Sequence, residues 1–338
     1  MDSTRTVFFG SGPFALPILA RLVDPGPRHR PTDALDAVPA GEVGGTPEVG
    51  GTPAMRVDII AVVTAPPRPA GRTGEPRPSP VASLADAHGI PVLTPSSLRD
   101  APALQALRGL AADLIVLADY GRIMPPAVLE MPKHGALNLH PSLLPRHRGA
   151  APVAAAILAG DATTGVTLMR MDQGLDTGPI LAQRQIKLAG SEVAPDLEAC
   201  LADVAADLLA ESLPAWLEGR LAARPQAQEG VTLTRPLRRA DGWLDPERPA
   251  LELERQVRAY QPWPGSYTQV DGERLIVWRA SVAGDQTAVP AAGRVGHLVP
   301  AGDTLALLTS AGALRLDEVQ PAGRRRMSGA DYRRGLRR

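Results

Sequence analysis

Short apolar segments alternate with segments of helical periodicity over the first 217 residues of the chain. Apolar runs typical of buried strands lie at residues 6–9, 57–63, 91–93, 113–118, 137–140, 165–171 and 180–188. Apolar residues recur at helical spacing at residues 14–23, 81–88, 103–110, 150–159 and 196–217. Strands that alternate with helices usually form a mostly parallel sheet with helices on both faces. The pattern therefore predicts an α/β domain.

The pattern changes after Gly219, where a polar segment with several prolines begins. One helical stretch, at residues 251–257, is followed by short strands at 267–270, 274–282, 293–299, 305–309 and 314–319. Short strands with glycine-rich turns and few helices are typical of a small β-barrel. We therefore predict a first domain over residues 1–219, a linker over 220–238 and a second domain over 239–338.

Residues 24–56 interrupt the first domain with a segment that is rich in proline and glycine and has no aromatic residue. The sequence Val-Gly-Gly-Thr-Pro occurs twice within it, at 43–47 and 49–53. Two copies are too few for a repeat architecture. The composition instead predicts a mobile surface insertion.

Composition limits the possible classes of function. The chain has 338 residues, 44% of them hydrophobic, and its 36 basic and 36 acidic side chains give no net charge. The single cysteine, Cys200, excludes an internal disulfide, and six scattered histidines show no ligand spacing, so we expect no metal site. We find no signal peptide and no apolar run near the roughly 20 residues that span a bilayer. We therefore expect a cytoplasmic protein with no membrane partner.

Candidate chemistry concentrates in two motifs, Asn-Leu-His-Pro-Ser-Leu-Leu-Pro at 138–145 and Gly-Leu-Asp-Thr-Gly at 174–178. Residues two apart in a strand point to the same side, so Asn138 and His140 are predicted to project together. An amide donor can stabilise the anionic oxygen of a tetrahedral intermediate, and an imidazole can move a proton. Asp176 can orient that imidazole and favour its protonated form. This combination indicates acyl transfer to an amine.

A purely structural role is the alternative for each of these residues. Asn138 can cap a turn, and His140 can be a hydrogen-bonded residue at a strand end. Their position at the carboxyl end of a predicted strand, where open α/β sheets bind ligands, favours the functional interpretation. Leu143 and Leu144 can line a slot for a flat ring, although an ordinary strand-to-helix loop explains them equally well.

Two further motifs carry weaker signals. Gly10, Gly12 and Ala15 match a loose dinucleotide-binding pattern, but no acidic residue ends the second strand, so we interpret them as a structural turn. The last fifteen residues contain seven arginines and one aspartate. Such a run is either a solvated surface or a phosphate-binding patch on the small barrel.

Together these residues resemble the methionyl-tRNA formyltransferase family over nearly the whole chain outside the insertion. The resemblance to the catalytic signature lies in residues 138–140, 142–146, 148–152 and 171–178. Residues 68–72 and 78–81 resemble the tRNA-contacting loop of that family. Residues 261–264, 320–324 and 327–328 resemble the C-terminal domain of the same family.

The resemblance implies a Rossmann-like domain that binds 10-formyltetrahydrofolate and an OB-like barrel that binds initiator methionyl-tRNA. It implies that Asn138, His140 and Asp176 are catalytic. The folate pocket would include Ser142, Leu143, Leu144 and Pro145. The tRNA contacts would include Arg72 in the first domain and Arg324, Arg325 and Arg326 in the second.

The predicted reaction is formylation of the methionine α-amino group on initiator tRNA, a step of translation initiation. Nothing in the sequence requires an oligomer, so we expect a monomer. Two alternatives remain open. One is another folate-dependent enzyme, either a small-amine formyltransferase or a hydrolase. The other is an RNA-binding protein with a vestigial enzyme domain, which the intact set of Asn138, His140 and Asp176 disfavours.

Overall fold

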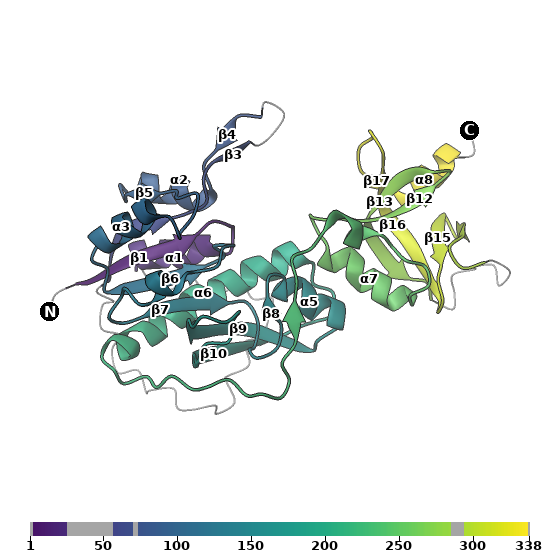
Figure 1. Cartoon of the computed structure of the whole chain (residues 1–338). Coiled ribbons are helices and arrows are strands. Elements are labelled where there is room, and N and C mark those ends of the chain that lie inside the picture. Colours follow the sequence, from purple (N-terminus) through teal and green to yellow (C-terminus); the bar gives the residue numbers. More distant parts are fainter. Residues whose placement is uncertain (1–2, 26–56, 70–73, 285–293, 337–338) are drawn as a thin grey trace. The chain divides into compact units, whose positions relative to one another are not determined.

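The structure is a computed structural model that describes residues 3–25, 57–69, 74–284 and 294–336 (Figure 1). These residues form two compact units, each described separately below. The first unit comprises Met1–Pro152, Thr163–Lys187 and Glu198–Thr234, and the second comprises Val153–Ala162, Leu188–Leu197 and Arg235–Arg338. The predicted insertion lies outside the described residues from residue 26 onward, as does Arg72. The predicted domain boundaries stay predictions, but the first unit includes most of the segment assigned to the linker.

A seven-stranded sheet forms the centre of the first unit, in the order β10-β9-β7-β6-β1-β2-β5. Its strands are β1 (Thr4–Gly10), β2 (Val57–Val63), β5 (Val92–Leu93), β6 (Leu114–Ala118), β7 (Ala136–His140), β9 (Thr163–Arg170) and β10 (Ile180–Lys187). The first five are parallel, whereas β9 is antiparallel to β7 and β10 is antiparallel to β9. The connection between β9 and β10 is only residues 171–179, too short for the crossover that parallel strands require. The predicted α/β fold with a mostly parallel sheet is confirmed.

Helices follow the strands as the periodicity predicts. They are α1 (Ala15–Val23), α2 (Pro80–Ala87), α3 (Ala101–Gly109), α4 (Pro126–Leu129), α5 (Pro152–Ala159) and α6 (Ala194–Leu217). Helix α1 buries Ala15, Ile18, Leu19 and Leu22, the spacing of one helical face. Ser79 caps the start of helix α2, and its hydroxyl accepts a hydrogen bond from the Ala82 amide. No helix in the described part of the chain is long and apolar enough to cross a membrane.

One core of the first unit lies on a single face of the sheet. Strand alternation directs Val7 and Phe9 of β1 to this face and Phe8 to the opposite one. Val7 and Phe9 pack with Leu107 of α3 and Val128 of α4 in one cluster of buried residues. Because β1, β6 and β7, at the centre of this sheet, are almost completely buried, the positions of their carboxyl ends are fixed by packing on both faces.

The second unit contains a curled antiparallel sheet in the order β12-β13-β16-β15-β14, with β17 paired to β16. Its strands are β12 (Ser266–Val270), β13 (Glu273–Val282), β14 (Leu298–Ala301), β15 (Thr304–Leu308), β16 (Ala313–Pro321) and β17 (Met327–Ser328). Helix α7 (Ala250–Ala259) contributes Leu253 and Val257 to the core beneath β13 and β16. The prediction of a small OB-like β domain after the α/β domain is confirmed.

Three local predictions differ from the structure. Gly296 takes a left-handed φ of +87° within a turn, so the strand predicted from residue 293 begins only at Leu298. Helix α8 (Gly329–Leu336) was not predicted, because its arginine-rich sequence contains few apolar residues. The segment between β2 and α2, for which no strand was predicted, contains a short hairpin of β3 (Arg68–Pro69) and β4 (Pro76–Arg77).

Candidate active site

The site is built at the carboxyl ends of the parallel strands. The chain passes from β1 outward to β2 and β5, and from β6 outward to β7, so the direction of winding reverses between β1 and β6. Ligands of open α/β sheets bind at the carboxyl edge beside such a reversal. Asn138 and His140 lie at this edge, at the end of β7, and are 6% and 5% exposed. Both therefore occupy the predicted place.

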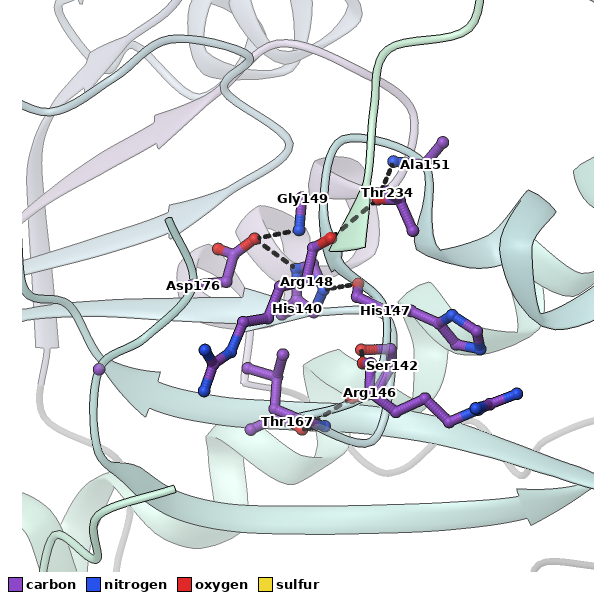
Figure 2. Close-up of polar contacts among 12 residues, drawn as sticks. His140, Ser142, Arg146, His147, Arg148, Gly149, Ala151, Thr167, Asp176 and Thr234 are labelled. Atoms are coloured by element: carbon purple, nitrogen blue, oxygen red, sulfur yellow. Dashed lines mark hydrogen bonds and ion pairs between the residues drawn. The ribbon is translucent and has the colours of Figure 1, made fainter. Parts of the chain in front are cut away.

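His140 is held between a backbone carbonyl and a carboxylate (Figure 2). Its Nε2 lies 2.9 Å from the carbonyl oxygen of His147, and its Nδ1 lies 3.7 Å from Oδ2 of Asp176. A carbonyl oxygen can only accept, so Nε2 carries a proton that it donates to His147. Nδ1 is then the nitrogen that remains free to gain or lose a proton. The His147 carbonyl, rather than Asp176, is thus the group that selects the tautomer.

Asp176 lies in the loop between β9 and β10 and faces the same imidazole. It takes a left-handed φ of +53°, and its Oδ2 also accepts a 2.7 Å hydrogen bond from the Gly149 amide. The loop is shaped from within by Asp172, whose Oδ1 accepts hydrogen bonds from the Gly174 amide and the Thr177 hydroxyl. A carboxylate anchored in this way, with a side chain only 14% exposed, is well placed to stabilise an imidazolium ion.

The Asn138 amide provides the third polar group. Among the described residues, no partner forms a hydrogen bond with this side chain, whereas His140, two residues along the same strand, forms one through Nε2. An amide N–H that is nearly buried and unengaged can donate to an oxygen that acquires negative charge. The structure thus brings together an imidazole and a carboxylate, with an amide donor two residues before the imidazole in β7.

The loop predicted to bind folate is tied down by its own polar groups. Ser142 is fully buried, and its hydroxyl donates to the carbonyl oxygen of Arg146 at 2.6 Å. Thr167 of β9 donates its hydroxyl to the Ser142 carbonyl and accepts from the Leu144 amide. Leu144 is 3% exposed, whereas Leu143 and Pro145 are partly exposed. Of the four residues, these two have side-chain surface available to a ligand, and their role in folate binding stays a prediction.

The predicted tRNA contacts stay predictions, and the structure describes only those in the second unit. Arg72 lies outside the described residues. Arg324, Arg325 and Arg326 are exposed in the second unit, between β16 and β17. The Arg326 guanidinium lies 3.5 Å from the centroid of the Trp278 ring, an arrangement in which a cation is attracted to the aromatic face.

The glycine loop after β1 is hydrogen-bonded to the residue that follows β6. The amides of Ser11 and Gly12 both donate to the carbonyl oxygen of Asp119, at 3.0 and 3.3 Å, which supports a structural turn. Asp119 is exposed as a whole residue, but its carboxyl group packs so closely that a Cβ on Gly12 would lie 1.7 Å from Oδ2. Desolvation, followed by the negative charge of Glu198, raises the pKa of this carboxyl group to about 7.

The sequence did not predict that the segment between the two predicted domains contacts the loops of the candidate site. Gln226 is 7% exposed and contacts the Asp176 loop, and Thr232 and Thr234 contact the loop that follows β7. The only signal was the alternation of Thr232 and Thr234, which places both side chains on one side of a strand. Among the described residues, no group of three or more metal-ligating side chains is present.

Two family models match the chain. The model described as formyl transferase matches residues 51–213, and the model described as formyl transferase, C-terminal domain, matches residues 236–337. Both Asn138 and Asp176 fall within the first match, and Arg324 to Arg326 fall within the second.

Solved structures with the same fold include an N-formyltransferase and HypX. An N-formyltransferase from Helicobacter canadensis, solved with folinic acid and dTDP-3-aminofucose, has a TM-score of 0.61 at 15% identity, over 95% of this chain and 100% of that one. HypX from Aquifex aeolicus has a TM-score of 0.58 at 16% identity, over 98% of this chain and 48% of that one. At these identities the likeness shows the fold alone.

Curated relatives are far more similar in sequence. A methionyl-tRNA formyltransferase of Chloroflexus aggregans is 47% identical over 281 residues, which cover 82% of this chain and 89% of the relative. The enzyme of the same name from Myxococcus xanthus is 44% identical over 279 residues, 82% of this chain and 88% of the relative. That of Roseiflexus castenholzii is 41% identical over 337 residues, 99% of this chain and 97% of the relative. The chain belongs to the methionyl-tRNA formyltransferase family.

Proposed function

We propose that the protein transfers the formyl group of 10-formyltetrahydrofolate to the α-amino group of methionine esterified to initiator tRNA. The observation that carries this proposal is the convergence of His140 and Asp176, with Nδ1 and Oδ2 3.7 Å apart, beside the unengaged amide of Asn138. The family membership specifies the donor and the acceptor. The proposal takes the reaction to be cytoplasmic, as a step of translation, and the enzyme to act as a monomer.

In the proposed mechanism, the neutral amine attacks the formyl carbon and a C–N bond forms. The carbonyl oxygen of the formyl group becomes an oxyanion, which the Asn138 amide stabilises through a hydrogen bond and His140 stabilises once it is protonated at Nδ1. His140 takes the proton that the amine loses and passes it to N10 of the folate as the C–N10 bond breaks. The Asp176 carboxylate stabilises the imidazolium ion formed between these two steps. The products are formylmethionyl-tRNA and tetrahydrofolate.

Incubation with 10-formyltetrahydrofolate labelled in the formyl group and with charged initiator tRNA tests this function. We expect the label to appear on the methionine of the tRNA at a rate proportional to enzyme concentration. Label released as formate, with none on the tRNA, would identify a hydrolase. Label transferred only to an added small amine would identify a different formyltransferase, and no turnover of the folate would indicate a vestigial domain.

The outer face of β12 and β13 supports an RNA partner for the second unit. Leu275 and Val277 of β13 are in the core, so Arg274 and Trp278 lie on the opposite face. The Arg274 guanidinium lies 3.8 Å from the ring centroid of Tyr267, and Arg326 stacks on Trp278. Aromatic rings and guanidinium planes are surfaces on which nucleotide bases stack, and arginine also pairs with phosphate.

Replacing Arg324, Arg325 and Arg326 together with alanine should raise the KM for tRNA and leave kcat nearly unchanged. Each lost phosphate contact should lower the slope of log KM against log salt by about 1, because fewer counterions are exchanged on binding. Steady-state kinetics over a series of salt concentrations measures both quantities. Alanine at Arg99 and Arg108, which are exposed in the first unit, provides the control. An unchanged salt slope in the triple variant would count against the arginine patch.

A further inference from the structure

We propose that Arg224, Gln226, Thr232 and Thr234, in the segment that ends the first unit, hold the two loops of the active site together, and that Gln226 is a positioning residue for Asp176. The inference rests on the proposed function, since it concerns the geometry of the acid–base pair His140 and Asp176. It also assigns a role to a segment that the sequence analysis treated as a linker.

Gln226 bridges the two loops that form the site. Its amide nitrogen donates to the carbonyl oxygens of Asp176 and Gly178, each at 2.8 Å. Its amide oxygen accepts from Nε and Nη2 of Arg148, at 3.0 and 2.6 Å. Both N–H groups and both lone pairs of the amide are thus used, and the partners fix which end of the amide is which. The side chain therefore connects the Asp176 loop directly to the loop that follows β7.

The backbone of the same segment is paired with the site at two points. Ile180, at the start of β10, exchanges two hydrogen bonds with Arg224, at 2.7 and 2.8 Å. Further along, β11 (Leu233–Thr234) pairs in parallel with β8 (Arg148–Gly149). The segment thus runs along the site from the base of the Asp176 loop to the loop that follows β7.

Two threonines, Thr232 and Thr234, add further hydrogen bonds between this segment and the loop that follows β7; Figure 2 shows those of Thr234. We call these contacts, with those of Gln226, the clamp. The Thr232 hydroxyl accepts from the His147 amide at 2.7 Å, and the Thr232 carbonyl accepts from the Arg148 amide at 2.9 Å. The Thr234 hydroxyl donates to the Arg148 carbonyl and accepts from the Ala151 amide, both at 3.0 Å. The approach is so close that a Cβ on Gly149 would lie 2.2 Å from the Thr234 carbonyl oxygen.

The clamped loop supplies the two backbone groups that orient the acid–base pair. The His147 carbonyl accepts from Nε2 of His140, and the Gly149 amide donates to Oδ2 of Asp176. Gln226 holds the backbone on both sides of Thr177, and so fixes the loop from which Asp176 projects. Without Gln226, two carbonyl oxygens and the Arg148 guanidinium lose their partners at a nearly buried position, so the loops must shift to find others. A shift of about 1 Å in a catalytic group can lower the rate roughly 10²-fold.

Substitutions in the full-length protein separate the two halves of this contact. Gln226→Ala removes the whole bridge. Gln226→Glu keeps an acceptor for Arg148 but cannot donate to the carbonyls of Asp176 and Gly178. We expect both variants to lower kcat about 10- to 10²-fold, with the KM for folate and for tRNA within about twofold of the wild type. Gln228→Ala, an exposed glutamine in the same segment, is the matched control and should behave as the wild type.

A second measurement follows the imidazole itself. The ¹⁵N chemical shifts of the His140 ring report its tautomer and environment in the protein without substrates. They should change in both Gln226 variants and remain unchanged in Gln228→Ala. Thr232→Val, which is close in shape but lacks the acceptor for the His147 amide, tests the same clamp if Gln226→Ala fails to fold. We expect it to shift the His140 signals in the same way.

The outcomes distinguish this inference from the proposed function. Wild-type kcat and unchanged His140 signals in Gln226→Ala would overturn the inference. Full activity in Gln226→Glu would also overturn it. The hydrogen bonds from Gln226 to the carbonyls of Asp176 and Gly178 would then be unnecessary, and only the contact with Arg148 would matter. A wild-type protein that forms no formylmethionyl-tRNA would instead refute the proposed function, while the ring signals would still report whether Gln226 positions His140.

Discussion

Replacing Asp176 with alanine is expected to lower kcat by about 10²- to 10⁴-fold, the contribution typical of a positioned acid–base group. Oδ2 of Asp176 lies 3.7 Å from Nδ1 of His140. Removal of the carboxylate therefore leaves the imidazolium ion without its counter-charge. Folate binding should be nearly unchanged. Single-turnover formylation measures the chemical step, and a separate titration with folate measures the affinity.

Two further substitutions separate the charge of Asp176 from its structural contact. Asp176→Asn can still accept from the Gly149 amide and should keep the loop in place, yet it should lose most of the activity. Asp172→Asn removes a carboxylate from the same loop without facing the imidazole, and it should retain most of the activity because its amide oxygen still accepts from Gly174 and Thr177. An Asp176→Ala enzyme with most of the wild-type rate would remove this residue from the mechanism.

Asn138→Ala should lower kcat by about 10²- to 10³-fold, as expected for the loss of one oxyanion donor. The side chain is 6% exposed at the end of β7, so a substrate oxygen at this point has little water to replace the lost amide. Asn138→Asp has the same shape but places negative charge beside the oxyanion, and it should be no more active than the alanine variant.

The contribution of Asn138 is measured by comparing the rate of the chemical step with the KM for both substrates. A loss confined to kcat indicates an interaction made in the transition state, whereas a change in KM alone indicates uniform binding. An Asn138→Ala enzyme that retains more than a tenth of the wild-type kcat would contradict the assigned role.

The parts of the structure that sequence predicts well are those set by local periodicity. The buried run of β7 and the two-residue spacing of Asn138 and His140 predicted that both lie at the carboxyl edge of a parallel sheet, and the structure places them there. The distant loop that carries Asp176 was assigned to the same site by its motif. Strand direction is harder to read from the run of apolar residues, since the antiparallel β10 follows from a short connection rather than from its own composition.

The parts that sequence misses depend on contacts between distant segments. The tautomer of His140 is set by the backbone carbonyl of His147, a group that every residue type possesses. Gln226 lies in a polar segment with no periodicity, and its role arises only when it reaches Asp176 and Arg148, 50 and 78 residues away along the chain. A side chain whose partners are mostly backbone atoms leaves no pattern in a single sequence.

The connection between α1 and β2 has a consequence for how this enzyme can vary. Helix α1 ends at Val23, and β2 begins at Val57 beside Thr4, the first residue of β1. Added chain length therefore enters the fold where the parallel strands begin, and the reacting groups occupy the margin where those strands finish. We therefore expect that deletion of this connection leaves turnover intact, which a rate measurement on the shortened protein checks.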